Sequence, residues 1–289
     1  MKKNNNILSF AIMLGALCCS CSSNTDGGQG SWTPKGDAHI KRIEVKAAGT
    51  LIEVMDMAYD ETGRLISFKK TDAASDAPVF DCSYTYDGAT LTIKDMALQA
   101  GTGKEIIATM HKDAVSYRTT HWQGWEYTTG ISGGVATGTA SRSSYKVNGD
   151  HYTANVSYVE SYDVQGGNIL TASYATDVED VTSKGTRGVS DSKLLVTYSY
   201  SGEKDVVGFN AFIMDCVTPV WLAAGLPGCA NLICDVTVSG DNATPVDYQM
   251  SRHYDYTMDS AGRVTSATRT DKSGNEAVCM MTYEISYYD

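Results

Sequence analysis

Apolar and polar residues alternate with a period of two along most of the chain beyond residue 40. In the segment 80–86, one set of alternate positions holds Phe, Cys, Tyr and Tyr, and the other set holds Asp, Ser and Thr. Successive side chains of a β-strand point to opposite faces of the sheet, so this pattern is typical of a half-buried antiparallel strand. The same alternation returns at 152–162, 194–200, 248–258 and 278–288. The sequence therefore predicts an all-β fold.

Short turn signals separate the predicted strands. Asp-Gly, Asn-Gly and Gly-Gly pairs occur at 87–88, 148–149 and 166–167. Such pairs favour two-residue hairpin turns, which place consecutive strands side by side as an antiparallel meander. Five prolines among 289 residues leave the strands largely uninterrupted. We expect a single β domain, 38–289, in which the meander forms an open or closed barrel-like sheet.

One hairpin sequence occurs twice. Tyr-Asp-Glu-Thr-Gly-Arg-Leu spans 59–65, and Asp-Ser-Ala-Gly-Arg-Val spans 259–264. Aspartate opens a turn through side-chain hydrogen bonds to nearby backbone amides, and glycine accepts the positive φ that closes the turn. We therefore expect Gly63 and Gly262 to lie at positive φ.

Two segments depart from the alternation. Residues 177–192 are mostly polar and include two glycines, so we expect either a long loop or a mobile excursion of the chain there. Residues 209–228 are apolar without a period of two, and a Thr-Pro pair at 218–219 resembles a helix N-cap followed by a first-turn proline. A short helix from Pro219 to Ala224 is predicted to cover one end of the barrel as a plug, with Trp221 buried.

The first residues have the features of a bacterial lipoprotein signal. Lys2 and Lys3 precede an apolar stretch, 7–17, that is too short to span a bilayer as a helix. The sequence Leu-Cys-Cys-Ser-Cys-Ser-Ser at 17–23 resembles a lipobox. We assign lipidation to Cys21, because a small residue precedes it and a polar segment follows, with Cys19 as the alternative site. A plain secretory signal with incidental cysteines is the alternative interpretation.

This assignment divides the chain into a signal peptide, 1–20, a flexible tether, 21–37, and the β domain. Removal of the signal peptide changes the formal net charge from −11 to −13. A protein with this negative charge is not expected to bind nucleic acid or anionic membrane surfaces. We expect a monomer held at the outer membrane by its lipid, with the periplasmic or surface side left open.

Five cysteines lie in the predicted β domain: Cys82, Cys216, Cys229, Cys234 and Cys279. An odd number does not indicate a disulfide framework. Cys82 and Cys279 lie in alternating segments and are expected to act as small core residues. Cys229 and Cys234 are close enough in sequence to form a local disulfide, and this possibility stays open.

The repeated hairpins, the lipobox and the single helical break together resemble a family of uncharacterised lipoproteins from Bacteroidetes with a porin-like fold. The resemblance covers most of residues 38–289, and its more specific part is the helical break followed by Leu-Pro-Gly at 226–228. Similar Tyr-Asp turns occur in tandem in shell-forming repeat proteins of bacterial toxin systems, but only two copies are clear here. The resemblance implies the fold and the envelope location, and it implies no catalytic residues.

No motif in the sequence indicates catalysis or a cofactor. The five histidines form no His-Glu-x-x-His pattern or other close pair, and no phosphate-binding glycine loop is present. The letters Gly-x-Ser-x-Gly occur at 130–134, but no helix is predicted after them, as a nucleophile elbow requires. We therefore expect a protein that is not an enzyme, with no metal or other cofactor.

One dense aromatic cluster, at 121–127, is the candidate ligand-binding site. Trp125 and Tyr127 would share a strand face, and Trp122 would point the other way. Exposed aromatic rings stack on sugars, so glycan binding is one hypothesis, and cross-strand packing of the rings is the other.

Three functions remain open from the sequence. The first is a non-enzymatic binding module of the cell envelope for a glycan, a peptide or a protein partner. The second is a carrier of a small apolar ligand inside the barrel. The third is an enzyme of unknown class. A channel-forming membrane barrel is disfavoured, because polar residues occupy positions where a lipid-facing band is apolar.

Overall fold

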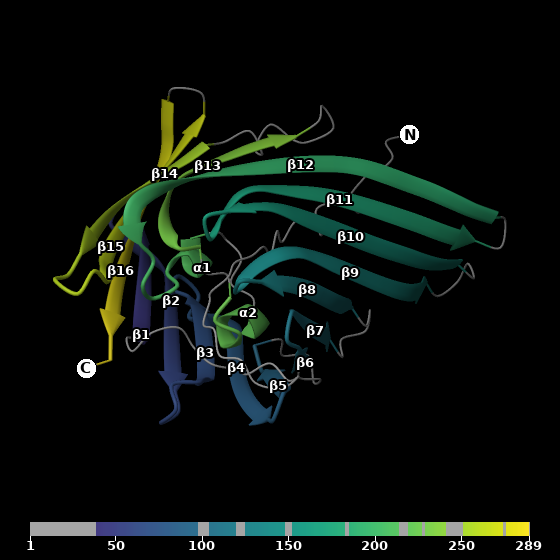
Figure 1. Cartoon of the computed structure of the whole chain (residues 1–289), viewed down its shortest axis with the longest axis horizontal. Helices are drawn as coiled ribbons and strands as arrows, with labels where there is room; N and C mark the ends of the chain where they lie inside the picture. The colour runs from purple at the N-terminus through teal and green to yellow at the C-terminus, as the bar shows by residue number, and fades with distance from the viewer. Residues whose placement is uncertain are drawn as a thin grey trace.

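The computed structural model describes residues 39–97, 104–119, 125–147, 152–182, 185–213, 219–226, 229–240, 251–273 and 276–288. Within these ranges, sixteen antiparallel strands form a closed barrel (Figure 1). Each strand pairs with its neighbours in the sequence, and β1 closes the barrel against β16. The predicted antiparallel meander is confirmed, and of the two forms expected the barrel is the closed one.

The described strands are β1 (Ile40–Ala47), β2 (Thr50–Tyr59), β3 (Leu65–Asp72), β4 (Ala77–Asp87), β5 (Thr90–Asp95), β6 (Lys104–Met110), β7 (Ala114–Thr119), β8 (Glu126–Ser132), β9 (Val135–Val147), β10 (Tyr152–Gln165), β11 (Asn168–Thr182), β12 (Gly185–Lys204), β13 (Asn231–Gly240), β14 (Ser251–Met258), β15 (Val264–Ser273) and β16 (Glu276–Tyr287). Two short helices, α1 (Asn210–Ile213) and α2 (Pro219–Ala223), lie in the connection between β12 and β13.

The barrel has two different ends. The connection between β12 and β13, which contains both helices, lies at one end of the barrel, and we call this the helix end. Tight turns at the same end join β2 to β3, β4 to β5, β6 to β7, β8 to β9, β10 to β11 and β14 to β15. The described parts of that connection, 205–213 and 219–226, form the plug. Towards the other end, β9 to β12 extend well beyond their neighbours (Figure 1), and β12 alone has 20 residues.

The apolar core lies at the helix end, between the plug and the inner faces of the strands. Phe209 of the plug is fully buried, and its ring meets Tyr256 and Tyr283 edge-on at centroid distances of 6.3 and 6.1 Å. Trp221 of α2 is 4% exposed, which confirms the predicted burial. The barrel is therefore not hollow at this end.

The plug begins with a buried aspartate. The carboxylate of Asp205 accepts hydrogen bonds from the backbone amides of Phe209 and Asn210 at 2.7 and 3.0 Å, so it satisfies donors at the start of α1. Asn210 then ties α1 to β13, because its side chain donates to the carbonyl of Asn231 and accepts from the amide of Ile233. Pro219 is the first residue of α2 as predicted, and Thr218 lies outside the described residues.

The two repeated hairpins form the same turn. Gly63 and Gly262 lie at φ values of 79° and 76°, which confirms the prediction. The carboxylate of Asp60 accepts hydrogen bonds from the backbone amides of Thr62 and Arg64, and Asp259 accepts from the amides of Ala261 and Arg263.

Each repeated turn is also covered by a tyrosine from an adjacent strand. The Arg64 guanidinium lies 4.8 Å from the ring centroid of Tyr86, and that of Arg263 lies 4.7 Å from Tyr287. The hydroxyls of Tyr86 and Tyr287 donate to the carbonyls of Leu65 and Val264, at 2.8 and 2.7 Å. These contacts hold the end of β4 against β3 and the end of β16 against β15.

The expectation of a long loop at 177–192 is wrong. β11 runs to Thr182 and β12 starts at Gly185, and the two strands pair residue by residue from Asp177↔Ser190 to Thr182↔Gly185. Backbone amides and carbonyls hold this ladder, so polar side chains do not prevent it. The polar composition that suggested a loop belongs to a hairpin that continues past the barrel core.

The outer face of the barrel carries ion pairs. Arg42 lies 3.0 Å from Asp56, Lys46 lies 2.6 Å from Glu284, and Arg142 lies 2.8 Å from Glu126. Lipid-facing strands of membrane barrels carry an apolar band about 25 Å tall, and these charged positions interrupt such a band. No helix of the described chain is long and apolar enough to cross a membrane.

Candidate functional site

The inner face of the barrel from β7 to β11 carries a group of aromatic side chains around one carboxyl group. We call this group the aromatic wall. Its members are all half-buried: Tyr117, Trp125, Tyr127, Glu160, Tyr162 and Tyr174.

Strand register brings these side chains together. Tyr117 of β7 lies directly opposite Tyr127 of β8, and their rings stack at a centroid distance of 4.5 Å and an interplanar angle of 8°. The Trp125 ring lies 6.0 Å from that of Tyr127 at an angle of 31°. In the next strands, Glu160 of β10 pairs with Tyr174 of β11. Residues that are 57 positions apart in the sequence, 117 and 174, thus belong to one surface.

Two contacts show that this surface faces inward. Thr129, two residues after Tyr127 on the same strand face, is fully buried and lies 3.0 Å, hydroxyl to hydroxyl, from Thr139 of β9. Burial raises the pKa of Tyr117, and the Trp221 side chain of the plug opposes that rise. The aromatic wall therefore lies next to the plug, with Tyr117 beside Trp221.

Glu160 is the titratable group of the aromatic wall. The Tyr162 hydroxyl donates to its Oε2 atom at 2.5 Å. Burial raises the pKa of Glu160 to about 7, because the charged carboxylate loses hydration, and the hydrogen bond from Tyr162 opposes this rise. Burial also raises the pKa of Tyr162 well above its usual value, so this phenol stays neutral when the carboxyl ionises.

The structure brings together Trp125 and Tyr127, two of the three residues predicted from the sequence. Trp122 lies outside the described residues. The stacking of Tyr127 on Tyr117 is a cross-strand pair, as the packing alternative requires, yet the rings keep half-exposed surface inside the barrel. Sequence reasoning missed Tyr117, Glu160, Tyr162 and Tyr174. Their alternation along the strands was visible, but the register that aligns them was not.

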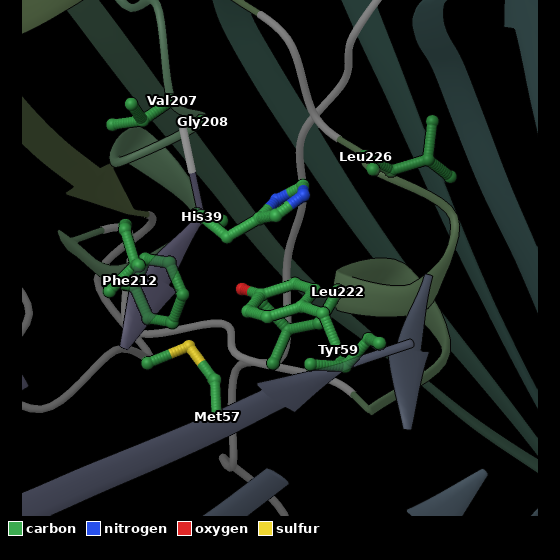
Figure 2. A pocket seen from close by; sticks show the side chains of 12 residues that line it. His39, Met57, Tyr59, Val207, Gly208, Phe212, Leu222 and Leu226 are labelled. Atoms are coloured by element: carbon green, nitrogen blue, oxygen red, sulfur yellow. The ribbon is translucent and has the colours of Figure 1, made fainter. Parts of the chain in front are cut away.

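A small hollow lies at the helix end, between the plug and strands β1 to β3 (Figure 2). The rings of His39 and Tyr59 stack at 4.4 Å on one side, and Leu222 and Leu226 of the plug lie across from them, with Phe212 and Met57 close by. Its volume is about 60 Å³. Ligand pockets for small molecules have volumes of about 300–1,000 Å³. This hollow is thus a packing gap and too small for an apolar cargo.

The cysteines carry no reactive site in the described chain. No disulfide joins Cys229 to Cys234: Cys229 is a buried thiol 3.1 Å from the Tyr200 hydroxyl, and the Cys234 thiol donates to the Asp235 carboxylate at 3.3 Å. Burial and the neighbouring Asp235 raise the pKa of Cys234, which disfavours the nucleophilic thiolate. Cys82 is buried as predicted, whereas Cys279 is only half-buried.

A histidine and an aspartate face each other next to Cys234. The Nδ1 atom of His253 lies 2.7 Å from Asp235, so the imidazole is oriented by a carboxylate. The thiol contacts the same carboxylate and not the imidazole, so no base is placed to activate it. Among the residues that the structure describes, no group of three or more His, Cys, Asp or Glu side chains is arranged to hold a metal ion.

Comparisons with known proteins support the architecture. A porin-like protein from Bacteroides uniformis aligns over 89% of this chain and 100% of its own, with a TM-score of 0.52 and 13% identity. A porin-like protein from Bacteroides vulgatus aligns over 87% of this chain and 99% of its own, with the same TM-score and identity. No family model matches the chain, and no curated protein matches it. At this identity the likeness shows a porin-like all-β fold.

Proposed function

We propose that the protein is a non-enzymatic binding protein of the cell envelope that takes a small polar ligand into its barrel at the aromatic wall. The observation that carries this proposal is the half-buried set of stacked rings beside Glu160 on the inner face of β7 to β11. Ring faces provide apolar contact area, and phenol and carboxyl groups beside them provide oriented hydrogen bonds. Sugars and other ring-bearing or methyl-bearing polar molecules suit such a surface.

The alternative of an apolar carrier receives less support. Its site would be the plugged end, where the hollow beside Tyr59 has a volume of about 60 Å³. The side chains that could line a larger apolar chamber there, including Phe209 and Trp221, instead fill it.

The place of this barrel in the cell belongs to the same proposal. An outer face with ion pairs such as Arg42–Asp56 and Lys46–Glu284 suits a barrel that stands in water and is held by a lipid. The lipid on Cys21 would supply the membrane attachment, and the segment 21–37 would tether the barrel to it.

Binding at the aromatic wall is tested with Trp125→Ala. Loss of this indole should weaken binding of a retained ligand about twofold to tenfold, since aromatic contacts contribute about 0.5–1.5 kcal/mol beyond the area that they bury. Isothermal titration calorimetry with a panel of neutral disaccharides, amino sugars and small amines measures the effect. Tyr288→Ala, an exposed ring at the helix end, is the matched control and should leave affinity unchanged. A panel in which no compound binds, or in which Trp125→Ala binds as wild type, contradicts the proposal.

The anchor is tested separately with Cys21→Ala in the full chain. We expect the variant to leave the membrane fraction or to accumulate unprocessed, because the acceptor of the lipid is gone. Fractionation and immunoblotting measure this, with Cys18→Ala as the control. If Cys21→Ala stays in the membrane fraction while Cys19→Ala leaves it, the lipid is on Cys19.

A further inference from the structure

We propose that the ligand of the aromatic wall is an organic cation, with an amine or methylated ammonium group seated on the rings and the Glu160 carboxylate as its counter-charge. This inference rests on the proposed function, and it adds the charge and the chemical class of the ligand.

The first observation is the charge balance of the aromatic wall. None of its described members is basic, and no described Lys or Arg pairs with Glu160, whose hydrogen-bond partner is the neutral Tyr162. The nearest described arginines in these strands, Arg118 and Arg142, are exposed, and Arg142 pairs with the exposed Glu126. A carboxylate held in this place therefore lacks a counter-charge from the described chain.

Two pairs of opposite charges on the inner face neutralise each other. Arg269 and Asp271 of β15 form a buried bidentate pair, with N–O distances of 2.6 and 2.7 Å. Lys70 of β3 lies 2.6 Å from Glu53 of β2. The buried carboxylate of Asp95 on β5 instead accepts hydrogen bonds from the backbone amides of Asp81 and Ala97. Glu160 has neither arrangement: it lies among aromatic rings with one neutral phenol as its donor, which leaves its charge for a ligand to balance.

The second observation is the kind of surface around that carboxyl. The rings of Tyr117 and Tyr127 stack, and the Trp125 ring lies tilted against that of Tyr127. Tyr162 follows Glu160 on β10 and donates to it, and Tyr174 lies opposite Glu160 on β11. The faces of phenol and indole rings carry negative potential and attract ammonium groups, and sets of such rings recognise methylated ammonium ligands. A carboxylate beside them adds a charge-assisted contact in a partly desolvated site, where it is stronger than in water.

The titration of Glu160 gives the proposal a pH signature. The groups that face it are the phenols of Tyr117 on β7, Tyr162 on its own strand and Tyr174 on β11, the hydroxyl of Thr139 on β9, and no described base. Because burial places the pKa of Glu160 at about 7, the carboxyl is largely protonated below pH 6 and ionised above pH 8. A cation binds the ionised form, so its affinity should fall as the pH falls through 7.

The experiment compares choline with 3,3-dimethyl-1-butanol, an uncharged molecule of the same shape. Calorimetry or ligand-observed NMR with the wild-type chain at pH 8 should show choline binding at least tenfold more tightly than the alcohol. Choline affinity should drop about tenfold or more between pH 8 and pH 5.5, because each pH unit below the pKa costs about tenfold. Glu160→Gln, which keeps the shape and can still accept from Tyr162, should remove both the preference for charge and the pH dependence. Thermal melts verify that the variant is folded.

Equal affinity for choline and the alcohol overturns the proposal, as does a cation preference that persists in Glu160→Gln. If neutral disaccharides bind in a Trp125-dependent manner and no cation does, the binding function stands and the cationic ligand is refuted. If nothing in either set binds, both proposals fail. The comparison of the two ligands on the wild-type chain decides the matter even if Glu160→Gln does not fold.

Discussion

Trp221→Ala is expected to lower the free energy of unfolding by about 3–5 kcal/mol, as for a large aromatic residue removed from a packed core. Trp221 is 4% exposed, and its neighbours in α2, Val220 and Ala223, are also buried. α2 packs against β3, and Trp221 reaches Tyr117 on β7, so the indole joins parts of the barrel that are far apart in the sequence. Truncation leaves a cavity that the closed sheet around it cannot collapse to fill.

Chemical denaturation monitored by far-UV circular dichroism measures this change. Trp125→Ala is the matched control, because it removes the same side chain from a half-exposed position and should cost clearly less. If Trp221→Ala unfolds at the same denaturant concentration as the wild type, the plug does not stabilise the barrel and the two helices act as a movable cover.

Arg269→Met should destabilise the protein by a similar amount, about 3–5 kcal/mol, because it leaves the Asp271 carboxylate buried without its partner. The two residues are 7% and 4% exposed, and the guanidinium meets the carboxylate through two hydrogen bonds of 2.6 and 2.7 Å. An unpaired carboxylate in this environment must either stay charged at a high desolvation cost or take up a proton.

A double variant separates the loss of a partner from the loss of packing. Arg269→Met with Asp271→Leu should recover most of the lost stability, since an apolar pair of similar volume often replaces a buried ion pair without penalty. Arg42→Met is the surface control: Arg42 and Asp56 are 42% and 47% exposed in their side chains, and such pairs contribute about 0–1 kcal/mol. If Arg269→Met costs no more than Arg42→Met, the inner pair is hydrated and the interior at β15 is open to water.

The local structure could be predicted from the sequence because local sequence causes it. A period of two is the period of a strand, so segments such as 80–86 could hardly have formed anything else with one buried face. The Asp-x-x-Gly turns follow from the hydrogen-bonding reach of one carboxylate and from the φ freedom of glycine, which the values at Gly63 and Gly262 confirm. Burial of Trp221 could be predicted because the apolar run around it has no polar side to turn towards water.

The error at 177–192 shows the limit of such reasoning. A polar, glycine-containing segment has two physical solutions, a hydrated loop or a ladder held by backbone hydrogen bonds. Its own side chains do not decide between them. Here a register that starts at Gln165↔Asn168 continues past the barrel core along β10 and β11, and β12 extends it, so neighbouring strands supplied the missing partners.

The sequence by itself determined the alternating strands, the Asp-x-x-Gly turns and the position of the plug, because these depend on residues a few positions apart. The tertiary structure alone decided that the barrel closes, that β1 meets β16, and that Tyr117, Tyr127, Glu160 and Tyr174 share one inner surface. The reason is physical: a shift of one residue in register turns every side chain of a strand to the other face. The aromatic pair Trp125 and Tyr127 could be found along one strand, but the carboxyl group that gives the site its charge lies two strands away in the sheet.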